Sequence, residues 1–357
     1  MIEARITKQI EAGAKSAGFT LDLDFRAEAG ITVVFGPDRS GKTLLFDSIA
    51  GFARPDAGRI MLDDRILFDA ASRVKLSPQQ RNCGYVLQRD ALFPNMTIRE
   101  NLLFAADRLP RLERHRKVNE TIERFQLGGD SAGQRQSPAS ERIRCLLARS
   151  LMRSPRLLLL DEPVQGLDAR SRRDFWPLLR TVAESAGIPI LLATNHLEDC
   201  FQAGGEVLVI REGRIVQRGR PRDILEQPAN VEMARLLGIA NVFQGEITAL
   251  DPGRNTSRVK IQEHELTGTY FPGHLLGDRV WLCAHAKDLR AAGRNGARLE
   301  NNQIPAKLLH VAELPHSVRL EFSGDICVDM PRSEFERQKD NKEWLVEFPP
   351  AALRVLS

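Results

Sequence analysis

The stretch that decides the fold is Gly36-Pro37-Asp38-Arg39-Ser40-Gly41-Lys42-Thr43, which fits the pattern G-x-x-x-x-G-K-[ST]. Glycines let the backbone pass close to a phosphate. The N–H groups of the loop and of the helix that follows it favour an anion. In this pattern Lys42 reaches the β- and γ-phosphates, and the hydroxyl of Thr43 holds Mg²⁺. The sequence therefore predicts that residues 36–43 bind the phosphates of a nucleotide.

The flanks of this loop have the required pattern. Residues 31–35 are almost continuously apolar, as in a strand buried on both faces, and residues 44–49 have a helical pattern. Further short apolar strands are expected at 156–160 and 190–193, and a hairpin at 207–216. Helical patterns lie between these strands. This alternation predicts an α/β layer with a largely parallel sheet.

Two carboxylates follow one of these strands directly. The run Leu157-Leu158-Leu159-Leu160 ends in Asp161-Glu162. This places both side chains at the carboxyl edge of the sheet, where α/β proteins bind ligands. Asp161 suits the role of a Mg²⁺ ligand. Glu162 suits a general base that polarises an attacking water.

Composition limits the remaining function classes. The chain has 51 Lys and Arg against 47 Asp and Glu, a weak excess that does not argue for nucleic acid. The basic cluster 111–117 is interrupted by Glu113, and we interpret it as a solvated helix face. Five separated cysteines argue against a disulfide framework or a zinc site. No apolar run approaches 18 residues, so we expect neither a membrane span nor export.

The length of 357 residues predicts two domains. We expect an α/β domain over residues 1–238, with a helical subdomain inserted at about 88–153. After Gly238 the pattern changes to short alternating segments separated by turns, which predicts a small β barrel or sandwich over 239–357.

With these features together, the chain resembles an ABC transporter ATPase over nearly its whole length. The Q-loop glutamine of that family corresponds to Gln88, the D-loop to Gly166-Leu167-Asp168, and the switch histidine to His196. The resemblance implies that Gln88 contacts Mg²⁺ or water and relays the nucleotide state to the helical subdomain. It implies that His196 contacts the γ-phosphate and that an aromatic residue stacks on adenine. Phe19 is the candidate for that residue, and ATP and Mg²⁺ are the implied cofactors.

Two departures from the family pattern stand out. Arg39 occupies a position where importers of this family usually carry glycine, and it either crowds the loop or adds a phosphate contact. The family signature, Leu-Ser-Gly-Gly-Gln or -Glu, aligns without gaps to Ser137-Pro138-Ala139-Ser140-Glu141, where only Glu141 matches. Pro138 offers neither a hydroxyl nor an N–H to a phosphate. A rival alignment to 131–135 requires seven extra residues before the helix, and we prefer the gapless one.

The resemblance extends to the C-terminal region, which is similar to the TOBE/Mop-like barrel of molybdate importers over 302–309 and 318–324. The implied fold class is a P-loop ABC ATPase domain with an inserted helical subdomain, followed by a small all-β (OB/TOBE-like) barrel. Molybdate or a related oxyanion is the preferred cargo, and sulfate, sugar and polyamine are the alternatives. The implied partners are integral-membrane permease subunits, a second ATPase subunit (identical or different) and, indirectly, a periplasmic or extracellular substrate-binding protein. Nucleic acid is not among them. The implied location is cytoplasmic, on the inner face of the cell membrane.

Two functions remain open from the sequence. One is a transport ATPase, favoured by the intact Lys42, Asp161, Glu162 and His196. The other is an ATP-binding regulatory or partner subunit with little turnover, favoured by Pro138 in the altered signature.

Overall fold

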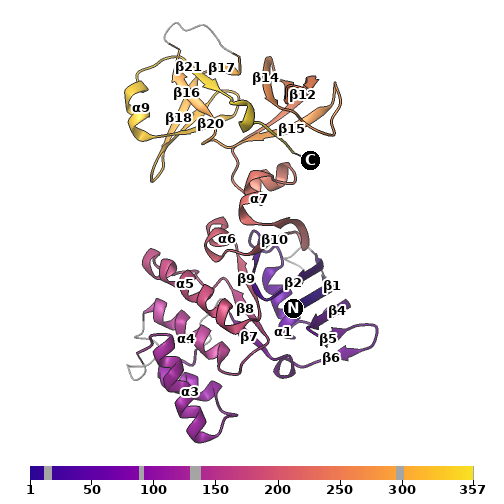
Figure 1. Ribbon diagram of the computed structural model, residues 1–357, viewed down its shortest axis with the longest axis vertical. Coiled ribbons are helices and arrows are strands. Elements are labelled where there is room, and N and C mark those ends of the chain that lie inside the picture. The colour runs from indigo at the N-terminus through magenta and orange to yellow at the C-terminus, as the bar shows by residue number, and fades with distance from the viewer. Residues whose placement is uncertain (12–17, 88–91, 129–137, 295–300, 357) are drawn as a thin grey trace. The chain divides into compact units, whose positions relative to one another are not determined.

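The computed structural model of the protein describes residues 1–11, 18–87, 92–128, 138–294 and 301–356. The chain divides into two compact units, residues 1–222 and 223–357 (Figure 1). This division precedes the expected boundary at Gly238 because α7 (Pro221–Glu226) ends within the second unit. There the Leu225 carbonyl lies 3.0 Å from His285 Nε2, and Arg354 donates to the Glu226 carbonyl. None of the helices in the described residues has the length and apolarity needed to cross a membrane.

The predicted α/β layer is confirmed as a six-stranded sheet in the first unit. Its order is β11-β10-β3-β9-β8-β7, and every neighbouring pair is parallel except the β10–β11 hairpin. The central strands are apolar on both faces, and Leu157 to Leu160 are fully buried. The strands are β3 (Gly30–Phe35), β7 (Cys83–Val86), β8 (Leu157–Asp161), β9 (Pro189–Thr194), β10 (Glu206–Arg211) and β11 (Arg214–Gly219).

A second sheet of the first unit was not predicted. It is antiparallel, with the order β2-β1-β4-β5-β6. The strands are β1 (Ile2–Ile10), β2 (Phe19–Ala27), β4 (Ala57–Leu62), β5 (Arg65–Asp69) and β6 (Val74–Lys75), and η1 (Pro78–Gln80) follows them. The sequence does carry its signal, because Leu21, Leu23 and Phe25 alternate with exposed polar residues. The helix α1 (Lys42–Ala50) shares one apolar core with residues of both sheets.

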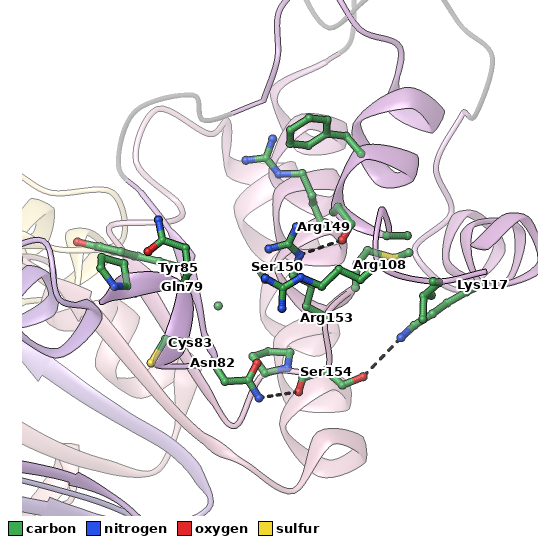
Figure 2. Close-up of a pocket in the computed structure, with 18 of the residues that line it drawn as sticks. Gln79, Asn82, Cys83, Tyr85, Arg108, Lys117, Arg149, Ser150, Arg153 and Ser154 are labelled. Carbon is green, nitrogen blue, oxygen red and sulfur yellow. Dashed lines mark hydrogen bonds between the residues drawn. The ribbon is translucent and has the colours of Figure 1, made fainter. Parts of the chain in front are cut away.

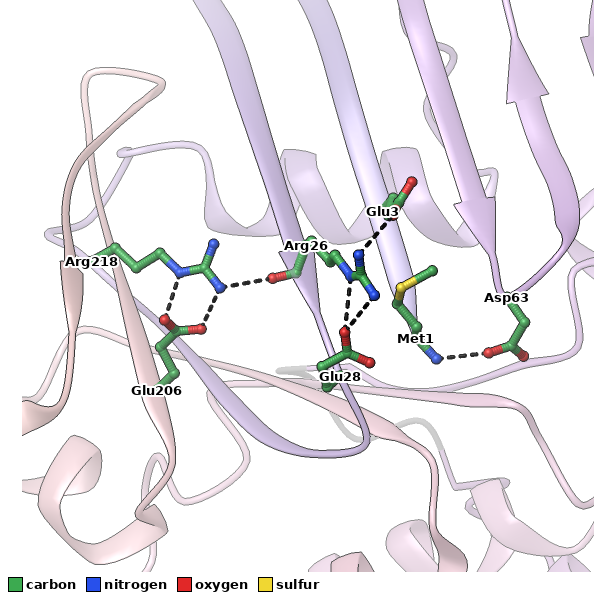
Figure 3. A network of polar contacts seen from close by, with 7 residues as sticks. All are labelled: Met1, Glu3, Arg26, Glu28, Asp63, Glu206 and Arg218. Carbon is green, nitrogen blue, oxygen red and sulfur yellow. Dashed lines mark hydrogen bonds and ion pairs between the residues drawn. The ribbon is translucent and has the colours of Figure 1, made fainter.

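Polar contacts join the edges of these two sheets (Figure 3). Arg218 on β11 donates Nε and Nη2 to Glu206, both at 2.6 Å, and Nη2 also donates to the Arg26 carbonyl on β2 at 3.1 Å. Within the antiparallel sheet, the N-terminal amine of Met1 is 2.7 Å from Asp63, between β4 and β5. The edge strand of the nucleotide-loop sheet is therefore tied to the edge strand of the antiparallel sheet.

The predicted helical insertion lies between β7 and β8. It contains α2 (Ile98–Ala105), α3 (Arg111–Arg124) and α4 (Ala139–Leu151). Thr97 and Glu100 cap α2 with reciprocal side-chain to backbone bonds, a pattern that starts helices in water. After β8, the chain continues through α5 (Ala169–Ala186) and α6 (Leu197–Ala203).

The second unit is built from antiparallel sheets, as the predicted all-β domain requires. One sheet has the order β14-β13-β12-β15-β22, and two three-stranded sheets have the orders β16-β21-β17 and β18-β19-β20. Their inner faces share one apolar core. The elements are α8 (Val231–Leu236), β12 (Asn241–Asp251), β13 (Thr256–Ile261), β14 (His264–Thr269), β15 (Arg279–Ala284), β16 (Arg290–Gly293), β17 (Gln303–Ala306), β18 (Leu308–Glu313), β19 (Val318–Phe322), β20 (Ile326–Met330), α9 (Arg332–Gln338), β21 (Trp344–Glu347), η3 (Pro350–Ala352) and β22 (Arg354–Leu356).

Candidate nucleotide-binding and catalytic site

The loop 36–43 connects the end of β3 to the first turn of α1. A Cβ atom on Gly36 would lie 2.2 Å from the Ile210 carbonyl oxygen, so the neighbouring strand leaves no room for a side chain. Gly41 has φ of +106°, a conformation that favours glycine, and it is followed directly by Lys42. Backbone geometry therefore requires both glycines. The first N–H groups of α1 have no intrahelical partner and suit an anion.

Lys42 is buried beneath this loop, with 5% of its side chain exposed. Its ammonium donates to the carbonyls of Gly36 at 2.9 Å and Pro37 at 3.0 Å, and it lies 3.7 Å from Glu162 Oε1. Burial lowers the pKa of Lys42, and the charges of Glu162, Asp38 and Asp161 oppose that shift. The structure thus holds a cation at the position where the motif predicts contact with phosphate.

Thr43 and Asp161 meet from different elements. The Thr43 hydroxyl at the start of α1 donates to Asp161 Oδ2 at the end of β8, at 2.8 Å. Burial raises the pKa of Asp161, and the bond from Thr43 partly opposes the shift. Two oxygen groups of the kind that ligate Mg²⁺, separated by 118 positions in the chain, are therefore adjacent.

Glu162 follows Asp161 in an unusual backbone conformation. Its φ is +49°, which a residue with a side chain adopts rarely. The Glu162 N–H donates to the Ala193 carbonyl at the end of β9, and this bond holds the turn. The turn keeps the Glu162 carboxylate largely buried and close to Lys42.

His196 lies just after β9, at the N-terminal cap position of α6. Its N–H donates to the Thr194 hydroxyl at 3.1 Å, and that hydroxyl donates to Asp199 Oδ2 at 2.7 Å. Asp199 is 1% exposed and accepts from Arg172 of α5 at 2.6 Å. On the other side of the loop, Asn195 Nδ2 donates to Asp38 Oδ1 at 2.9 Å. Both flanks of His196 are therefore anchored.

Sequence reasoning missed Arg172, Thr194, Asn195 and Asp199. No motif marks them, and Arg172 and Asp199 are 27 positions apart. The sequence signal nearest to this network is Asp168, which caps the first turn of α5 through bonds to the N–H groups of Arg170 and Ser171. That cap fixes the start of the helix that carries Arg172.

The remaining residues predicted for the loop are found at its rim. Phe19 begins β2, and its Cζ atom lies 3.0 Å from the point where a Cβ on Gly41 would be, so an aromatic ring borders the loop. Asp38 and Arg39 are exposed. Arg39 has φ of +63°, in the region that favours glycine, so its side chain strains the backbone at this position.

Two predicted features lie wholly or partly outside the described residues. Gln88 falls in the stretch 88–91, and Ser137 and the rival signature alignment fall in 129–137. Pro138 is described as the N-terminal cap position of α4, which begins at Ala139. Glu141 accepts a bond from the Gly128 N–H at 2.6 Å.

The residues present fit ATP with Mg²⁺. The Ser40 hydroxyl is buried and has no hydrogen-bond partner in the described part of the chain, and a phosphate oxygen would satisfy it. In the same residues, no three His, Cys, Asp or Glu side chains converge to form a metal site. One hydroxyl and one carboxylate, Thr43 and Asp161, are instead the small ligand set with which Mg²⁺ is held beside nucleotide phosphates.

A separate groove opens between β7 and the inserted helices (Figure 2). Its volume is about 500 Å³, and Tyr85, Arg108, Lys117, Arg149 and Arg153 are among the residues that line it. Tyr85 also donates to Asp47 of α1 at 3.2 Å, so the wall of the groove contacts the helix that begins at the nucleotide loop.

Comparisons with known proteins show what this chain is similar to. A family model described as ABC transporter matches residues 20–165. The chain is 35% identical to a molybdenum import ATP-binding protein of Rhodospirillum rubrum, over 68% of this chain and 66% of that protein. It is 30% identical to a protein of the same name from Paramagnetospirillum magneticum, over 82% and 81% of the two chains.

Other relatives have different cargoes in their names. A spermidine/putrescine import ATP-binding protein of Oleidesulfovibrio alaskensis is 32% identical over 76% of this chain and 71% of that protein. Among solved structures, a dimeric ATP-binding cassette in a post-hydrolysis state with ADP and phosphate has a TM-score of 0.53 at 20% identity. That match covers 62% of this chain and 99% of the other, and it supports the fold.

Proposed function

Because the chain belongs to the ABC transporter family of ATP-binding proteins, we propose that it is the ATP-hydrolysing subunit of an importer. The observation that carries this proposal is the convergence of Lys42, Thr43, Asp161 and Glu162 at one edge of the parallel sheet. Lys42 and Thr43 come from α1, Asp161 ends β8 and Glu162 follows it, and only the fold brings them together.

Each side chain has a role that its geometry supports. Bound ATP with Mg²⁺ supplies the phosphoric anhydride bond that water cleaves. Lys42 neutralises phosphate charge from beneath the loop, and Thr43 and Asp161 hold the metal ion. Glu162 accepts a proton from the attacking water. His196, held between Thr194 and Asp199, contacts the γ-phosphate.

The other predicted contacts complete the binding site. Backbone N–H groups of 36–43 and the Ser40 hydroxyl bind phosphate oxygens. Phe19 stacks on the adenine from the rim of the loop. Gln88 completes the Mg²⁺ or water contacts and communicates with the helical subdomain.

The preferred cargo of the importer is molybdate or a related oxyanion. Relatives named as molybdenum import proteins support this preference, and the polyamine relative keeps the alternatives open. Uptake of labelled molybdate, sulfate and putrescine by cells with and without this gene tests the assignment. Loss of molybdate uptake alone is expected, and loss of only putrescine or sulfate uptake would reassign the cargo.

The partners follow from the same role. We propose permease subunits in the membrane, a second ATPase subunit and, through the permease, a substrate-binding protein outside the cell. The protein then lies on the inner face of the cell membrane. The groove between β7 and the inserted helices suits the permease contact, because Tyr85 on its wall bonds to α1 and so connects it to the nucleotide loop.

A second candidate function is an ATP-binding subunit with little turnover. It is favoured by Pro138, Ala139 and Ser140, which replace the hydroxyl and glycines of the signature. Pro138 has no N–H to donate. A partner subunit with an intact signature would then complete one of two sites.

ATP turnover by the purified protein, with nucleotide binding measured in parallel, tests both candidates. If the parent hydrolyses ATP and Glu162→Gln binds it without turnover, the transport-ATPase proposal holds. If the parent binds without turnover and Pro138→Ser restores turnover, the second function replaces it. Absence of ATP binding in every variant would refute both.

A further inference from the structure

One short segment of this protein carries a clear excess of positive charge. Residues 108–117, RLPRLERHRK, contain five Lys or Arg and one acid, Glu113, so their formal net charge is 5 − 1 = +4. The whole chain has 51 − 47 = +4, so the other residues together are neutral. The sequence alone suggested an ordinary solvated helix face for most of this segment. Its structure indicates a more specific role.

The segment forms the end of the α2–α3 connection and the first two turns of α3. Arg108, Arg111, Leu112, His115 and Arg116 are all exposed, and Leu112 is 89% exposed. Residues four apart on a helix are neighbours, so Arg111 lies beside His115 and Leu112 beside Arg116. These five residues, which we call the basic surface, therefore combine an exposed leucine with three arginines and a histidine.

Two acids on the same helix, Glu113 and Glu120, offset only part of the charge of the basic surface. Arg108, Arg111 and His115 make no hydrogen bond or ion pair with the part of the chain that the structure describes. The contact of Arg116 with Glu120 is long, at 3.8 Å. Asp107 is already engaged by Arg153 at 2.8 Å.

The position of the basic surface indicates what it faces. Arg108 also lines the groove that we assign to the permease, so the surface and the groove are continuous. Because the proposed permease lies in the membrane, we take residues that border its contact surface to be on the membrane-facing side of the subunit. An exposed leucine among cations is the combination that binds a membrane surface, with the apolar group entering the headgroup region.

We propose that the basic surface binds the anionic headgroups of the membrane beside the permease. This proposal rests on the proposed function, because it requires a subunit that docks at a membrane. Each basic residue at an anionic bilayer strengthens binding by about fivefold at physiological salt. Arg108, Arg111 and Arg116 together then contribute about a hundredfold, and Leu112 adds an apolar contact.

The test uses the full-length protein and sedimentation with vesicles. One set is pure phosphatidylcholine, and the other contains roughly one-third phosphatidylglycerol. The triple variant R108Q/R111Q/R116Q removes three charges from the basic surface. The control R254Q/R279Q/R290Q removes three exposed charges from the second unit. A third variant, Leu112→Ser, removes the apolar group and leaves every charge in place.

We expect the parent to bind the anionic vesicles and not the neutral ones, and added salt to release it. The basic-surface variant should lose about a hundredfold in binding, the leucine variant several-fold, and the control no more than a few-fold. Equal losses in the basic-surface variant and its control would overturn the proposal, as would equal binding of the parent to both vesicle types. Capture of random-sequence RNA without vesicle binding, lost in the basic-surface variant, would assign the surface to nucleic acid instead.

The failure of this proposal is separable from failure of the proposed function. None of the substituted residues belongs to the nucleotide site, so ATP binding and turnover in solution should match the parent in every variant. A protein that binds anionic vesicles through the basic surface but does not hydrolyse ATP would retain this proposal and refute the hydrolytic role. Normal turnover without vesicle binding would retain the hydrolytic role and refute this proposal.

Discussion

Asp199→Asn tests whether the network beside His196 positions the site. The substitution preserves the size of the side chain and removes its charge. Asp199 is 1% exposed, and it accepts Arg172 Nη2 at 2.6 Å and the Thr194 hydroxyl at 2.7 Å. The two donors bond to different oxygens of Asp199. An asparagine has only one oxygen, because its other terminal group is an NH₂, so one of the two donors loses its acceptor.

The size of the effect follows from the burial of the pair. Removing one member of a buried ion pair costs about 3–5 kcal/mol. Arg172 keeps 29% of its side chain exposed, so water replaces part of the lost interaction. We therefore expect a loss near the lower limit, about 3 kcal/mol in the free energy of unfolding. With a slope of about 3 kcal/mol per molar urea, the midpoint falls by about 1 M.

The functional effect should appear in turnover more than in nucleotide affinity. Asp199 bonds to Thr194, whose hydroxyl accepts the His196 N–H, and none of the three lies in the loop 36–43. A displaced His196 should reduce kcat for ATP at least about tenfold while the Kd for ATP changes little. Thr194→Val removes the hydroxyl but leaves the Arg172–Asp199 pair, and it should lower kcat with a smaller loss of stability.

A matched pair in the second unit is the control. Arg319 donates Nε and Nη2 to Asp329 at 2.7 and 2.9 Å, with 31% and 18% of the two side chains exposed. Asp329→Asn should destabilise that unit modestly and leave kcat unchanged. The positioning argument is refuted if Asp199→Asn keeps the parental kcat while it is destabilised, or if Asp329→Asn lowers kcat equally.

Three further outcomes are expected. Gly58→Ala should cost at least about 2 kcal/mol in urea unfolding, because the new Cβ would lie 2.0 Å from the Arg5 carbonyl oxygen at a φ of +97°. Gly187→Ala, with φ of +60° and open space, is the milder control. Burial lowers the pKa of His285, so the folded second unit prefers the neutral ring. Its stability should fall as pH drops below about 6.5, and His285→Gln should flatten that dependence in unfolding measured across pH. Burial raises the pKa of the three buried thiols, to about 12 for Cys145 and Cys200 and about 11 for Cys283, so iodoacetamide at neutral pH should label these three only after unfolding, as read by mass spectrometry.

The sequence predicted those parts of the site that are contiguous in the chain. The loop 36–43 and the pair Asp161-Glu162 were identified because a phosphate site needs closely spaced glycines, a lysine and a hydroxyl. A carboxylate at the end of a buried parallel strand lies at the carboxyl edge of the sheet, where α/β folds bind their ligands. The β10–β11 hairpin and the inserted helices were also predicted, because local sequence patterns mark them. The roles of Phe19, Gln88 and His196 came from family resemblance, and they remain proposals, as do the roles of the loop 36–43, Asp161 and Glu162.

Only the tertiary structure decided which distant groups meet. Thr43 bonds to Asp161, and Arg172 reaches Asp199, because the parallel sheet brings the ends of β3, β8 and β9 together. The antiparallel sheet around α1 and the groove between β7 and the inserted helices likewise depend on packing between separated segments. A sequence determines local conformation through nearest-neighbour sterics and periodic burial, whereas contacts across the chain depend on how whole elements bury their apolar faces against each other.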